Sequence, residues 1–398
     1  MVSKPKMPDR AGEGIKTYCI FSANHLPNIG GVERYTDNLA RALAEASSNV
    51  VIVTNNVFGL KDRELLRERV EIVRLPCLNT LRGRYPLPRK NRHYRKLIAS
   101  LESRPVDYVV VNTRFYLHSL EGIRLAERHG VRPIVIDHGS AHLTMGNAAV
   151  DKAVAWYEHR ITDRVKRHDA DYYAVSRASA SWLGHFGIEA KGVLSNSIDA
   201  RAFRAQTSTR SFRTELGLER GAFLAAFVGR FIPEKGIGAI LEAARILAPR
   251  RDIAFALAGG GPLEDEIVAR NPGNVTLLGK LESPDVAALL RDADAFVLPT
   301  RSEGFSTSLL ETAACGTPPV VTYVGGVDEL VPDERFGIVL ERADGKEVAE
   351  RIAFLCDHPD ERERMGGALR AKVEAEFSWH AAAANVKAAC AAANPDAL

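Results

Sequence analysis

Short runs of β-branched and aromatic residues alternate with longer amphipathic stretches from Lys16 to the end of the chain. This alternation is typical of a parallel sheet whose strands are joined by crossover helices. It restarts after the polar stretch Arg201–Arg213, which we interpret as a connector and hinge. A chain of 398 residues is long enough for two α/β domains of similar size, and two domains imply a cleft between them.

The expected strands are short, and several are continuously apolar, as in sheets covered on both faces. In the first half they are Lys16–Phe21, Val50–Thr54, Glu71–Leu75, Tyr108–Asn112, Pro133–Asp137, Tyr172–Val175 and Gly192–Leu194. In the second half they are Phe223–Val228, Ile253–Ala258, Val275–Leu278, Ala295–Leu298, Pro319–Thr322 and Gly337–Leu340. Expected helices include Val32–Ala46, Leu120–His129, Asp151–Arg167, Ser179–Phe186 and Trp379–Ala392.

Composition excludes several classes of protein. With 46% hydrophobic and 26% charged residues and no apolar run long enough to span a bilayer, we expect a soluble, cytosolic chain. The first residues lack the apolar stretch of a secretory signal. The five cysteines are widely spaced, without a CxxC pair, and predict core thiols rather than disulfides or a zinc site. A net charge of +3 is too small to indicate nucleic-acid binding.

Two acidic residues flank the start of one predicted helix. Strand Ala295–Leu298 runs into PTRSEGFSTSLLETAACG, where a helix should begin near Ser306. Glu303 then lies on the loop, and Glu311 lies roughly 7–8 Å along the helix axis. The free N–H groups at this helix start favour an anion such as phosphate. Taken alone, Glu303 as a helix cap and Glu311 as a surface residue is the simpler interpretation.

Two cations after another strand change that balance. In VGRFIPEKG, Arg230 follows the strand directly and Lys235 opens the next helix. Ligands of such sheets bind at the carboxyl ends of the strands, so both cations should lie at the same edge as Glu303. Arginine offers a fork of donors and lysine a compact charge, which together suit a diphosphate.

Glycines follow strands in both halves. The loop AGGGP, Gly259–Pro262, either permits a tight turn or lets backbone approach a nucleotide, and we keep both interpretations. It is not a GxGxxG motif for a nicotinamide cofactor. In the first half, Gly30 and Gly31 precede a helix, where their N–H groups can meet a phosphate. His138 follows strand Pro133–Asp137 and can hydrogen-bond a substrate hydroxyl or carbonyl.

Two further patterns are weaker. The triplets Asp169-Ala170-Asp171 and Asp292-Ala293-Asp294 precede strands, at the wrong edge for a catalytic metal, and predict capping and turn roles. The basic run Arg82–Lys96 is either a solvated face or a dock for anionic lipid head groups or a phosphorylated acceptor.

Together these motifs resemble the retaining GT-B glycosyltransferases of family 4. The resemblance covers nearly the whole chain after residue 15 and is strongest from Asn196 to Val331. Matching segments, in order, are VGRFIPEKGIGAILEAARIL, LAGGGPLEDEI, LLGKL, DAFVLPTRSEGFSTSLLETAACGTPPVVTYVGGVDELV and FSWHAAA. The resemblance implies an α/β GT-B fold, with two Rossmann-like domains facing across a cleft and a C-terminal helix crossing back to the N-terminal domain.

The same resemblance implies the domain limits. An acceptor-side domain would comprise 15–198 together with the helix 378–398, and a nucleotide-sugar-binding domain would comprise 199–377. Residues 1–14 would form a flexible tail.

Roles for individual residues follow from the resemblance. Arg230 and Lys235 match the cations that neutralise the donor diphosphate. Glu311 matches the residue that holds the ribose hydroxyls, Glu303 lies against hydroxyls of the donor sugar, and His138 matches a histidine near its reacting face. The other positions expected to surround the donor are Gly30, Gly31, Gly259, Gly261, Lys280, Leu281, Phe305, Ser306 and Thr307.

The implied reaction moves a hexose from a UDP- or GDP-sugar to a hydroxyl of a glycan or lipid-linked acceptor, with retention at the anomeric carbon. It needs no metal and no cofactor, and it belongs to surface polysaccharide or glycolipid synthesis at the inner face of the membrane. Acceptor contacts are expected from the loops Asn112–Tyr116 and Ser140–Asn147. Alternatives are a nucleotide-sugar epimerase of the same fold and a non-catalytic nucleotide-sugar-binding protein.

The chain departs from the family pattern at a few positions. Ser306 stands where proline is common, Thr312 interrupts an EAMA-like segment, and Ser197 replaces a common glycine. His138 is followed by an unusual Gly139-Ser140. These departures leave the reaction class intact and put the identity of the sugar in doubt.

Overall fold

The computed structural model describes residues 14–28, 30–80, 83, 85–142 and 148–395. Most of the expected tail 1–14, the basic residues Arg82 and Arg84, and part of the loop Ser140–Asn147 therefore lie outside the described residues. The chain divides into two compact units, Met1–Asn196 with Trp379–Leu398, and Ser197–Ser378. We call them unit 1 and unit 2.

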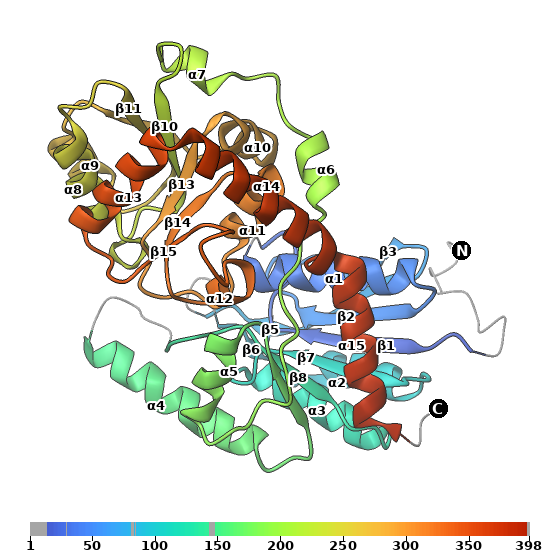
Figure 1. The fold of residues 1–398 in the computed structure, drawn as a ribbon. Helices are drawn as coiled ribbons and strands as arrows, with labels where there is room; N and C mark the ends of the chain where they lie inside the picture. The colour runs from blue at the N-terminus through green and yellow to red at the C-terminus, as the bar shows by residue number, and fades with distance from the viewer. Residues whose placement is uncertain (1–13, 29, 81–82, 84, 143–147, 396–398) are drawn as a thin grey trace. The chain divides into compact units, whose positions relative to one another are not determined.

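Unit 1 is built on a twisted sheet with the strand order β3-β4-β2-β1-β7-β8-β9 (Figure 1). All neighbouring strands are parallel except β3, which pairs antiparallel with β4 at the sheet edge. The strands are β1 (Thr17–Ser22), β2 (Asn49–Asn55), β3 (Arg63–Arg67), β4 (Val70–Leu75), β7 (Tyr108–Asn112), β8 (Ile134–Asp137) and β9 (Asp171–Ala174). The expected strand Gly192–Leu194 was wrong, because this segment makes only one isolated bridge, from Val193 to Ala174.

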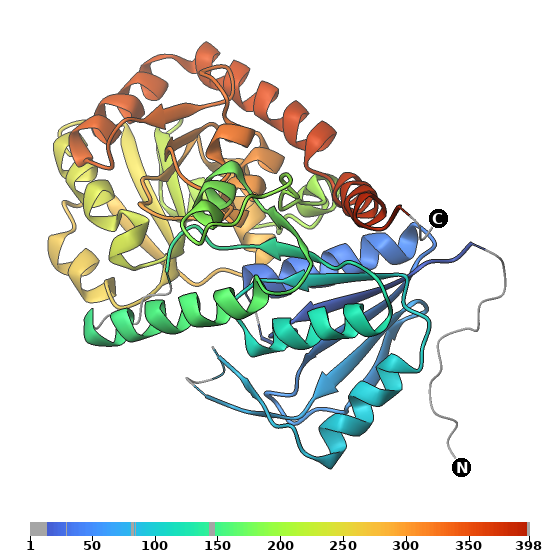
Figure 2. The same cartoon turned by 90° about the horizontal axis from the view of Figure 1, so that it is seen from below.

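Helices cover both faces of this sheet. Helix α1 packs with α15 on one face, whereas α2 and α3 lie on the other (Figures 1 and 2). The helices are α1 (Gly31–Glu45), α2 (Arg92–Glu102), α3 (Leu117–Arg128), α4 (Ala148–Val165), α5 (Arg177–Gly184) and α15 (Trp379–Ala393). The hairpin of β5 (Cys77–Leu78) and β6 (Leu87–Pro88) and helix α2 were not expected from the sequence.

Helix α15 returns the end of the chain to unit 1, as the fold class implies. It packs against α1, β7 and β8, with Val386 and Cys390 buried. At its end Asn394 accepts a hydrogen bond from the backbone N–H of Arg132 at 2.6 Å and donates to the carbonyl of the same residue at 2.9 Å. These two bonds attach the helix end to the loop before β8.

Unit 2 is a fully parallel sheet with the order β12-β11-β10-β13-β14-β15. Its strands are β10 (Phe223–Arg230), β11 (Ile253–Gly260), β12 (Val275–Gly279), β13 (Ala295–Leu298), β14 (Pro319–Thr322) and β15 (Ile338–Leu340). Its helices are α6 (Ala200–Ala205), α7 (Phe212–Glu215), α8 (Ile237–Leu247), α9 (Glu264–Arg270), α10 (Ser283–Asp292), α11 (Thr307–Cys315), α12 (Val327–Leu330), α13 (Gly345–Asp357) and α14 (Pro359–Glu376), with a 3-10 turn, η2 (Pro233–Lys235).

The polar stretch Arg201–Arg213 is part of unit 2 rather than a connector and hinge. Phe203 and Phe212 are buried, so helices α6 and α7 each place an aromatic ring in the core. Arg204 donates to the carbonyl of Ala314 at 2.7 Å and pairs with Glu374 at 2.5 Å. The expectation failed because the stretch is polar overall, although it contains two buried phenylalanines and an arginine that binds other elements of unit 2.

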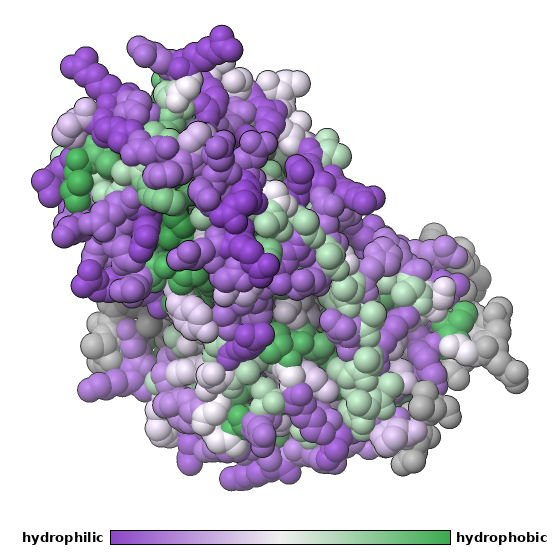
Figure 3. Space-filling model, in the orientation of Figure 1, coloured by the Kyte–Doolittle hydropathy of each residue, from purple (hydrophilic) through white to green (hydrophobic). Residues whose placement is uncertain are grey.

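No helix among the described residues is long and apolar enough to cross a membrane. The face drawn in Figure 3 is hydrophilic over most of its area, with apolar side chains gathered in small separate places.

Candidate functional site

The predicted donor residues of unit 2 lie at the carboxyl ends of parallel strands or on the loops and helix that follow them. Strand β10 pairs with β11 on one side and β13 on the other, and Arg230 is in register with Gly260. The loops after β10, β11 and β13 therefore leave the sheet at one edge, which is where open α/β sheets bind ligands.

The structure brings Lys235 and Glu303 together. The ammonium group of Lys235 forms an ion pair with Oε1 of Glu303, although the two residues are far apart in the chain. Their side chains are 15% and 18% exposed, so the pair is reached by solvent from one side only. The attraction within a partly shielded ion pair is screened less by solvent and salt than that within a surface pair.

Backbone contacts hold the two loops that carry this pair. The hydroxyl of Thr300 donates to the carbonyl of Glu234 at 2.9 Å, and the N–H of Arg301 donates to the same oxygen at 2.8 Å. Gly236 has φ +75°, and a Cβ there would collide with the carbonyl of Pro299. Glycine is therefore required for the loops to approach closely enough for Lys235 to reach Glu303.

Arg230 lies at the last position of β10 with its side chain exposed. Within the described residues no ion pair involves its guanidinium group, in contrast to Lys235. An exposed guanidinium at the carboxyl edge of the sheet can offer its fork of donors to an anionic ligand.

Helix α11 begins close to the position expected. Ser306 is its N-cap and accepts a hydrogen bond from the N–H of Leu309 at 3.3 Å, while Thr307 is the first helical residue. Phe305 is buried, with its ring centroid 5.9 Å from that of Phe377. Glu311 is partly exposed on the second turn. The remaining N–H groups at the helix start form a weakly positive end that favours an anion.

The glycine loop after β11 has a packing explanation. Gly259 has φ +150°, and a Cβ there would collide with the carbonyl of Gly229 on the adjacent strand. Gly261 has φ +159°, and a Cβ there would collide with the backbone of Phe231. Close approach of the backbone at the ends of β10 and β11 therefore accounts for glycine at these two positions.

Lys280 and Leu281 follow β12 at the same edge. Lys280 is exposed, and its side chain lies beside Gly260. Leu281 packs instead against the hydrophobic cluster that contains Phe212 and Leu224. The side chain of Leu281 is thus used in core packing, whereas the charge of Lys280 lies exposed at the sheet edge.

In unit 1, Gly30 and Gly31 lie at the start of α1, as expected. A carboxylate of the same helix, that of Glu33, lies beside Gly30 and accepts a hydrogen bond from Asn28 at 2.9 Å. Burial raises the pKa of Glu33, and hydrogen bonds from its own backbone N–H and from Asn28 oppose that rise. An anion binding at this helix start would therefore meet a carboxyl group that burial already favours in its neutral form.

His138 follows β8 and is held by a chain of hydrogen bonds. Its Nε2 lies 3.1 Å from Oδ1 of Asn112, whose amide donates to the hydroxyl of Thr36 at 2.8 Å. The ring of Tyr35 meets it edge-on at 4.8 Å between centroids. Burial lowers the pKa of His138 to about 3. The imidazole is therefore neutral at physiological pH, with Nε2 donating to Asn112 and Nδ1 as its acceptor.

A buried ion network was not recognised from the sequence. The side chain of Arg114 has no exposed area and binds Asp137 at 2.6 Å and Glu158 at 2.5 Å. The preceding residue, Thr113, has φ +71°, a strained value for a β-branched residue. Arg114 lies in the loop Asn112–Tyr116, which we expected to contact the acceptor, but its side chain points inward and is unavailable for that contact.

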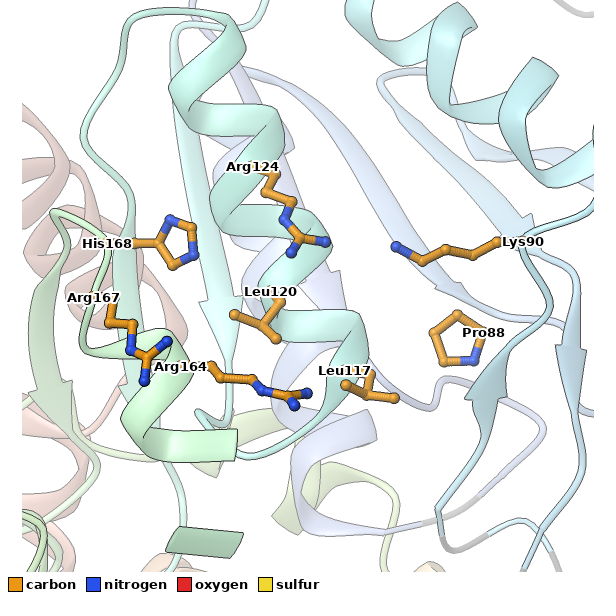
Figure 4. A pocket seen from close by; sticks show the side chains of 8 residues that line it. All are labelled: Pro88, Lys90, Leu117, Leu120, Arg124, Arg164, Arg167 and His168. Atoms are coloured by element: carbon orange, nitrogen blue, oxygen red, sulfur yellow. The ribbon is translucent and has the colours of Figure 1, made fainter. Parts of the chain in front are cut away.

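The basic run Arg82–Lys96 contributes to a pocket of about 410 Å³ in unit 1. The lining residues are Pro88, Lys90, Leu117, Leu120, Arg124, Arg164, Arg167 and His168. Figure 4 shows Lys90 and Arg124 pointing toward each other from opposite sides. Lys90 pairs with Glu121 at 2.8 Å. The three arginines form no ion pair within the part of the chain that is described, so the pocket has cationic walls and an apolar floor.

Aspartates of the two DxD triplets form ion pairs and hydrogen bonds with other groups of the protein. Asp171 pairs with Lys191 at 2.7 Å, and Asp292 accepts a hydrogen bond from the N–H of Phe212 at 2.7 Å. Asp294 pairs with Arg213 and accepts from the N–H of Leu224 at 2.9 Å. These contacts are structural, at the amino edges of the sheets.

Two family descriptions match the sequence. "Glycosyl transferases group 1" covers residues 208–372 and "Glycosyltransferase Family 4" covers residues 29–201. D-inositol 3-phosphate glycosyltransferase of Pseudarthrobacter chlorophenolicus is 27% identical over 393 residues, which cover 90% of this chain and 89% of that protein. A GDP-mannose-dependent monoacylated alpha-(1-6)-phosphatidylinositol monomannoside mannosyltransferase of Corynebacterium glutamicum is 32% identical over 199 residues, or 47% of this chain and 52% of that protein.

Solved structures share the fold. Sucrose-phosphate synthase from Thermosynechococcus elongatus superposes with a TM-score of 0.73 at 20% identity, covering 94% of this chain and 98% of that one. HepE of Anabaena, solved in complex with UDP, superposes with a TM-score of 0.72 at 17% identity, covering 95% of this chain and 100% of that one. At these identities the likeness establishes the architecture.

Proposed function

The chain belongs to the group 1 glycosyltransferases of GT-B fold, and from this premise we propose that it transfers a hexose with retention of configuration at the anomeric carbon. The donor is a UDP- or GDP-sugar, and the acceptor is a hydroxyl of a glycan or lipid-linked molecule. The observation that carries the proposal is the ion pair between Lys235 and Glu303 at the strand edge of unit 2, beside Arg230 and the start of α11.

The chemistry requires stabilisation of a leaving diphosphate as negative charge develops on it. Arg230, Lys235 and the N–H groups at the start of α11 supply positive charge at that edge without a metal. The carboxylate of Glu303 keeps the ammonium group of Lys235 oriented before the donor arrives. The second oxygen of the Glu303 carboxylate then accepts hydrogen bonds from the sugar hydroxyls, and the carboxylate of Glu311 accepts hydrogen bonds from the ribose hydroxyls.

Retention follows from same-face attack. None of the predicted donor-site side chains combines the position and chemistry of a covalent nucleophile with a neighbouring base. The leaving phosphate therefore removes the proton of the acceptor hydroxyl as the new bond forms on the face it leaves. His138 acts as a neutral group, and its Nδ1 accepts a hydrogen bond from a hydroxyl of the transferred sugar.

The acceptor side of the proposal rests on unit 1. The cationic pocket formed by Lys90 and three arginines suits a phosphate-bearing acceptor or an anionic head group. A cytoplasmic enzyme of surface polysaccharide or glycolipid synthesis would use it while associated with the inner face of the membrane. Binding to anionic vesicles should then fall steeply with salt, and equal binding by a variant with Arg124, Arg164 and Arg167 changed to glutamate would contradict this part.

The central test replaces the two donor cations separately. We expect Lys235→Ala and Arg230→Ala to slow transfer by about 10²–10³-fold, since each acts as an oxyanion-type stabiliser. Lys346→Ala, in an exposed helical pair of the same unit, is the matched control and should retain wild-type turnover. Near-normal turnover of both Lys235→Ala and Arg230→Ala would contradict the proposal.

Donor identity and reaction type are tested by two further measurements. A thermal-shift panel of UDP-, GDP-, ADP- and TDP-sugars should single out the donor, because tight binding raises the melting temperature. Proton NMR of that donor with enzyme and no acceptor should show no epimer. Appearance of an epimer would instead identify an epimerase, and binding with no turnover under any acceptor would identify a binding protein.

A further inference from the structure

Three histidines from separate elements of unit 1 converge. His142 lies in the loop after β8, His159 lies on α4, and His185 is the C-cap residue of α5. One ring nitrogen from each lies within 4.8 Å of the other two. Their ring centroids are 5.1–5.5 Å apart. Histidines 17 and 26 positions apart in sequence meet only because the fold brings a loop and two helices together.

The spacing of the nitrogens fits a coordinated ion. Nε2 of His185 lies 3.3 Å from Nε2 of His159. Zinc–imidazole bonds of roughly 2.0–2.1 Å at a tetrahedral angle place two ligand nitrogens about 3.3–3.4 Å apart. The 3.3 Å separation therefore corresponds to one edge of such a tetrahedron.

The third ring is already oriented by a carboxylate. Nδ1 of His142 lies 2.7 Å from Oε2 of Glu158, so Nε2 is the nitrogen left for a metal. A carboxylate behind a ligating imidazole fixes its tautomer and increases its basicity. Glu158 is itself held by Arg114 at 2.5 Å, which makes this side of the cluster rigid.

Aromatic rings enclose the cluster. Trp182 stacks on His185 with centroids 4.8 Å apart and an interplanar angle of 3°, and Phe186 lies 4.7 Å from His159. His142 is 27% exposed and His185 is exposed, so an ion can enter from solvent. A site with apolar walls, three nitrogen donors and an open side leaves a fourth position for water or another ligand.

We propose that His142, His159 and His185 bind one divalent transition-metal ion, with zinc as the expected occupant. Three imidazole donors favour zinc, cobalt, nickel or copper over the oxygen-preferring magnesium and calcium. The ion is separate from the predicted donor site of unit 2. It fastens the loop after β8, which also carries His138, to helices α4 and α5.

Direct metal binding tests the proposal without donor or acceptor, so its failure is distinct from failure of the transferase reaction. Untagged full-length protein is stripped with chelator, incubated with zinc chloride, passed through gel filtration and assayed by elemental mass spectrometry. We expect one zinc per chain and a higher melting temperature. Cobalt in place of zinc should give the intense visible absorption of a four-coordinate ion, and magnesium should not bind.

Single-ligand variants identify the site. His185→Ala and His159→Ala should lose stoichiometric zinc, and Glu158→Gln should bind zinc about 10–100-fold more weakly. His380→Ala, an exposed histidine of helix α15, should keep one zinc per chain. Because His185 is exposed, its variant should melt like metal-free wild type, which separates loss of the ligand from loss of the fold.

Two results would overturn the proposal. The first is that wild type retains no more zinc than the variant in which all three histidines are alanine, because the cluster would then be ring stacking with a direct hydrogen bond between His159 and His185. Equal zinc content in wild type, His159→Ala and His185→Ala would place the ion elsewhere.

Discussion

Replacement of Arg114 should strongly lower the free energy of unfolding of unit 1. Its guanidinium is fully buried and pairs with two buried carboxylates, those of Asp137 and Glu158. Arg114→Met would leave both without their cation, which costs about 3–5 kcal/mol in the free energy of unfolding. Urea denaturation measures the loss. The control is Arg124→Met, an exposed arginine of the cationic pocket, which should change stability by less than about 0.5 kcal/mol. Equal losses in the two variants would show that the buried network is not stabilising.

His118 should make unit 1 sensitive to acid. Burial lowers its pKa to about 4, and its Nε2–H donates to the carbonyl of Val53 at 2.9 Å. The unfolded chain, with a histidine pKa near 6.5, takes up the proton first as the pH falls. The stabilising contribution of the neutral ring is therefore complete above about pH 6.5 and is lost as the pH falls toward 4, by up to about 1.4 kcal/mol per pH unit.

His118→Gln isolates this effect, because glutamine keeps a donor for Val53 and does not titrate. The difference in unfolding free energy between wild type and His118→Gln should be smaller at pH 4.5 than at pH 7, because only the wild type loses stability through the titration of this group. His138, whose pKa is lowered in the same direction, is present in both proteins and cancels. Parallel pH profiles would contradict the assignment to His118.

At the residue scale, the sequence was most informative where strand ends fix position. Lys235 and Glu303 could be placed at one edge because each follows a recognisable apolar strand, but their ion pair was not predicted from the sequence. Arg114, His142, His159 and His185 could not be recognised. Their partners are distant in the chain, and neither spacing nor residue type indicates that they meet.

Helix α11 offers a test at the scale of an element. Ser306 caps its first turn, because its side-chain hydroxyl accepts a hydrogen bond from the N–H of Leu309. Ser306→Ala should lower the stability of unit 2 by about 1 kcal/mol and weaken donor binding, whereas Ser306→Thr should keep both because it retains the hydroxyl. Thermal unfolding with and without the donor measures the two effects. A loss of equal size in Ser306→Thr would mean that packing, not capping, matters here.

Three strands were predicted with the limits that the structure shows. Strands β7, β13 and β14 have the expected limits because continuous apolar runs allow few alternatives. Helix α2 escaped notice because Arg92, Arg95 and Lys96 made its first turns look like a solvated basic run. The helical signal was present in Tyr94, Leu97, Ile98 and Leu101, which recur at helical spacing and are all buried.

The return of helix α15 makes unit 1 depend on both ends of the chain. The helix buries Val386 and Cys390, and Lys387 donates to the carbonyl of Ala46 at 2.8 Å, at the end of α1.

A chain that stops after Ser378 exposes the outer side of α1 and parts of β7 and β8, which should lower the free energy of unfolding of unit 1 by more than about 2 kcal/mol. Hydrogen exchange resolved by peptide should therefore show lost protection in β7, β8 and α1, with β10 and β13 of unit 2 unchanged. Asn394→Ala, which removes the two hydrogen bonds to Arg132 and one to the carbonyl of Cys390, should reproduce a small part of that loss near β8. Uniform loss of protection in both units would show that the helix stabilises the whole chain rather than unit 1, because only a local role predicts a boundary in protection between the units.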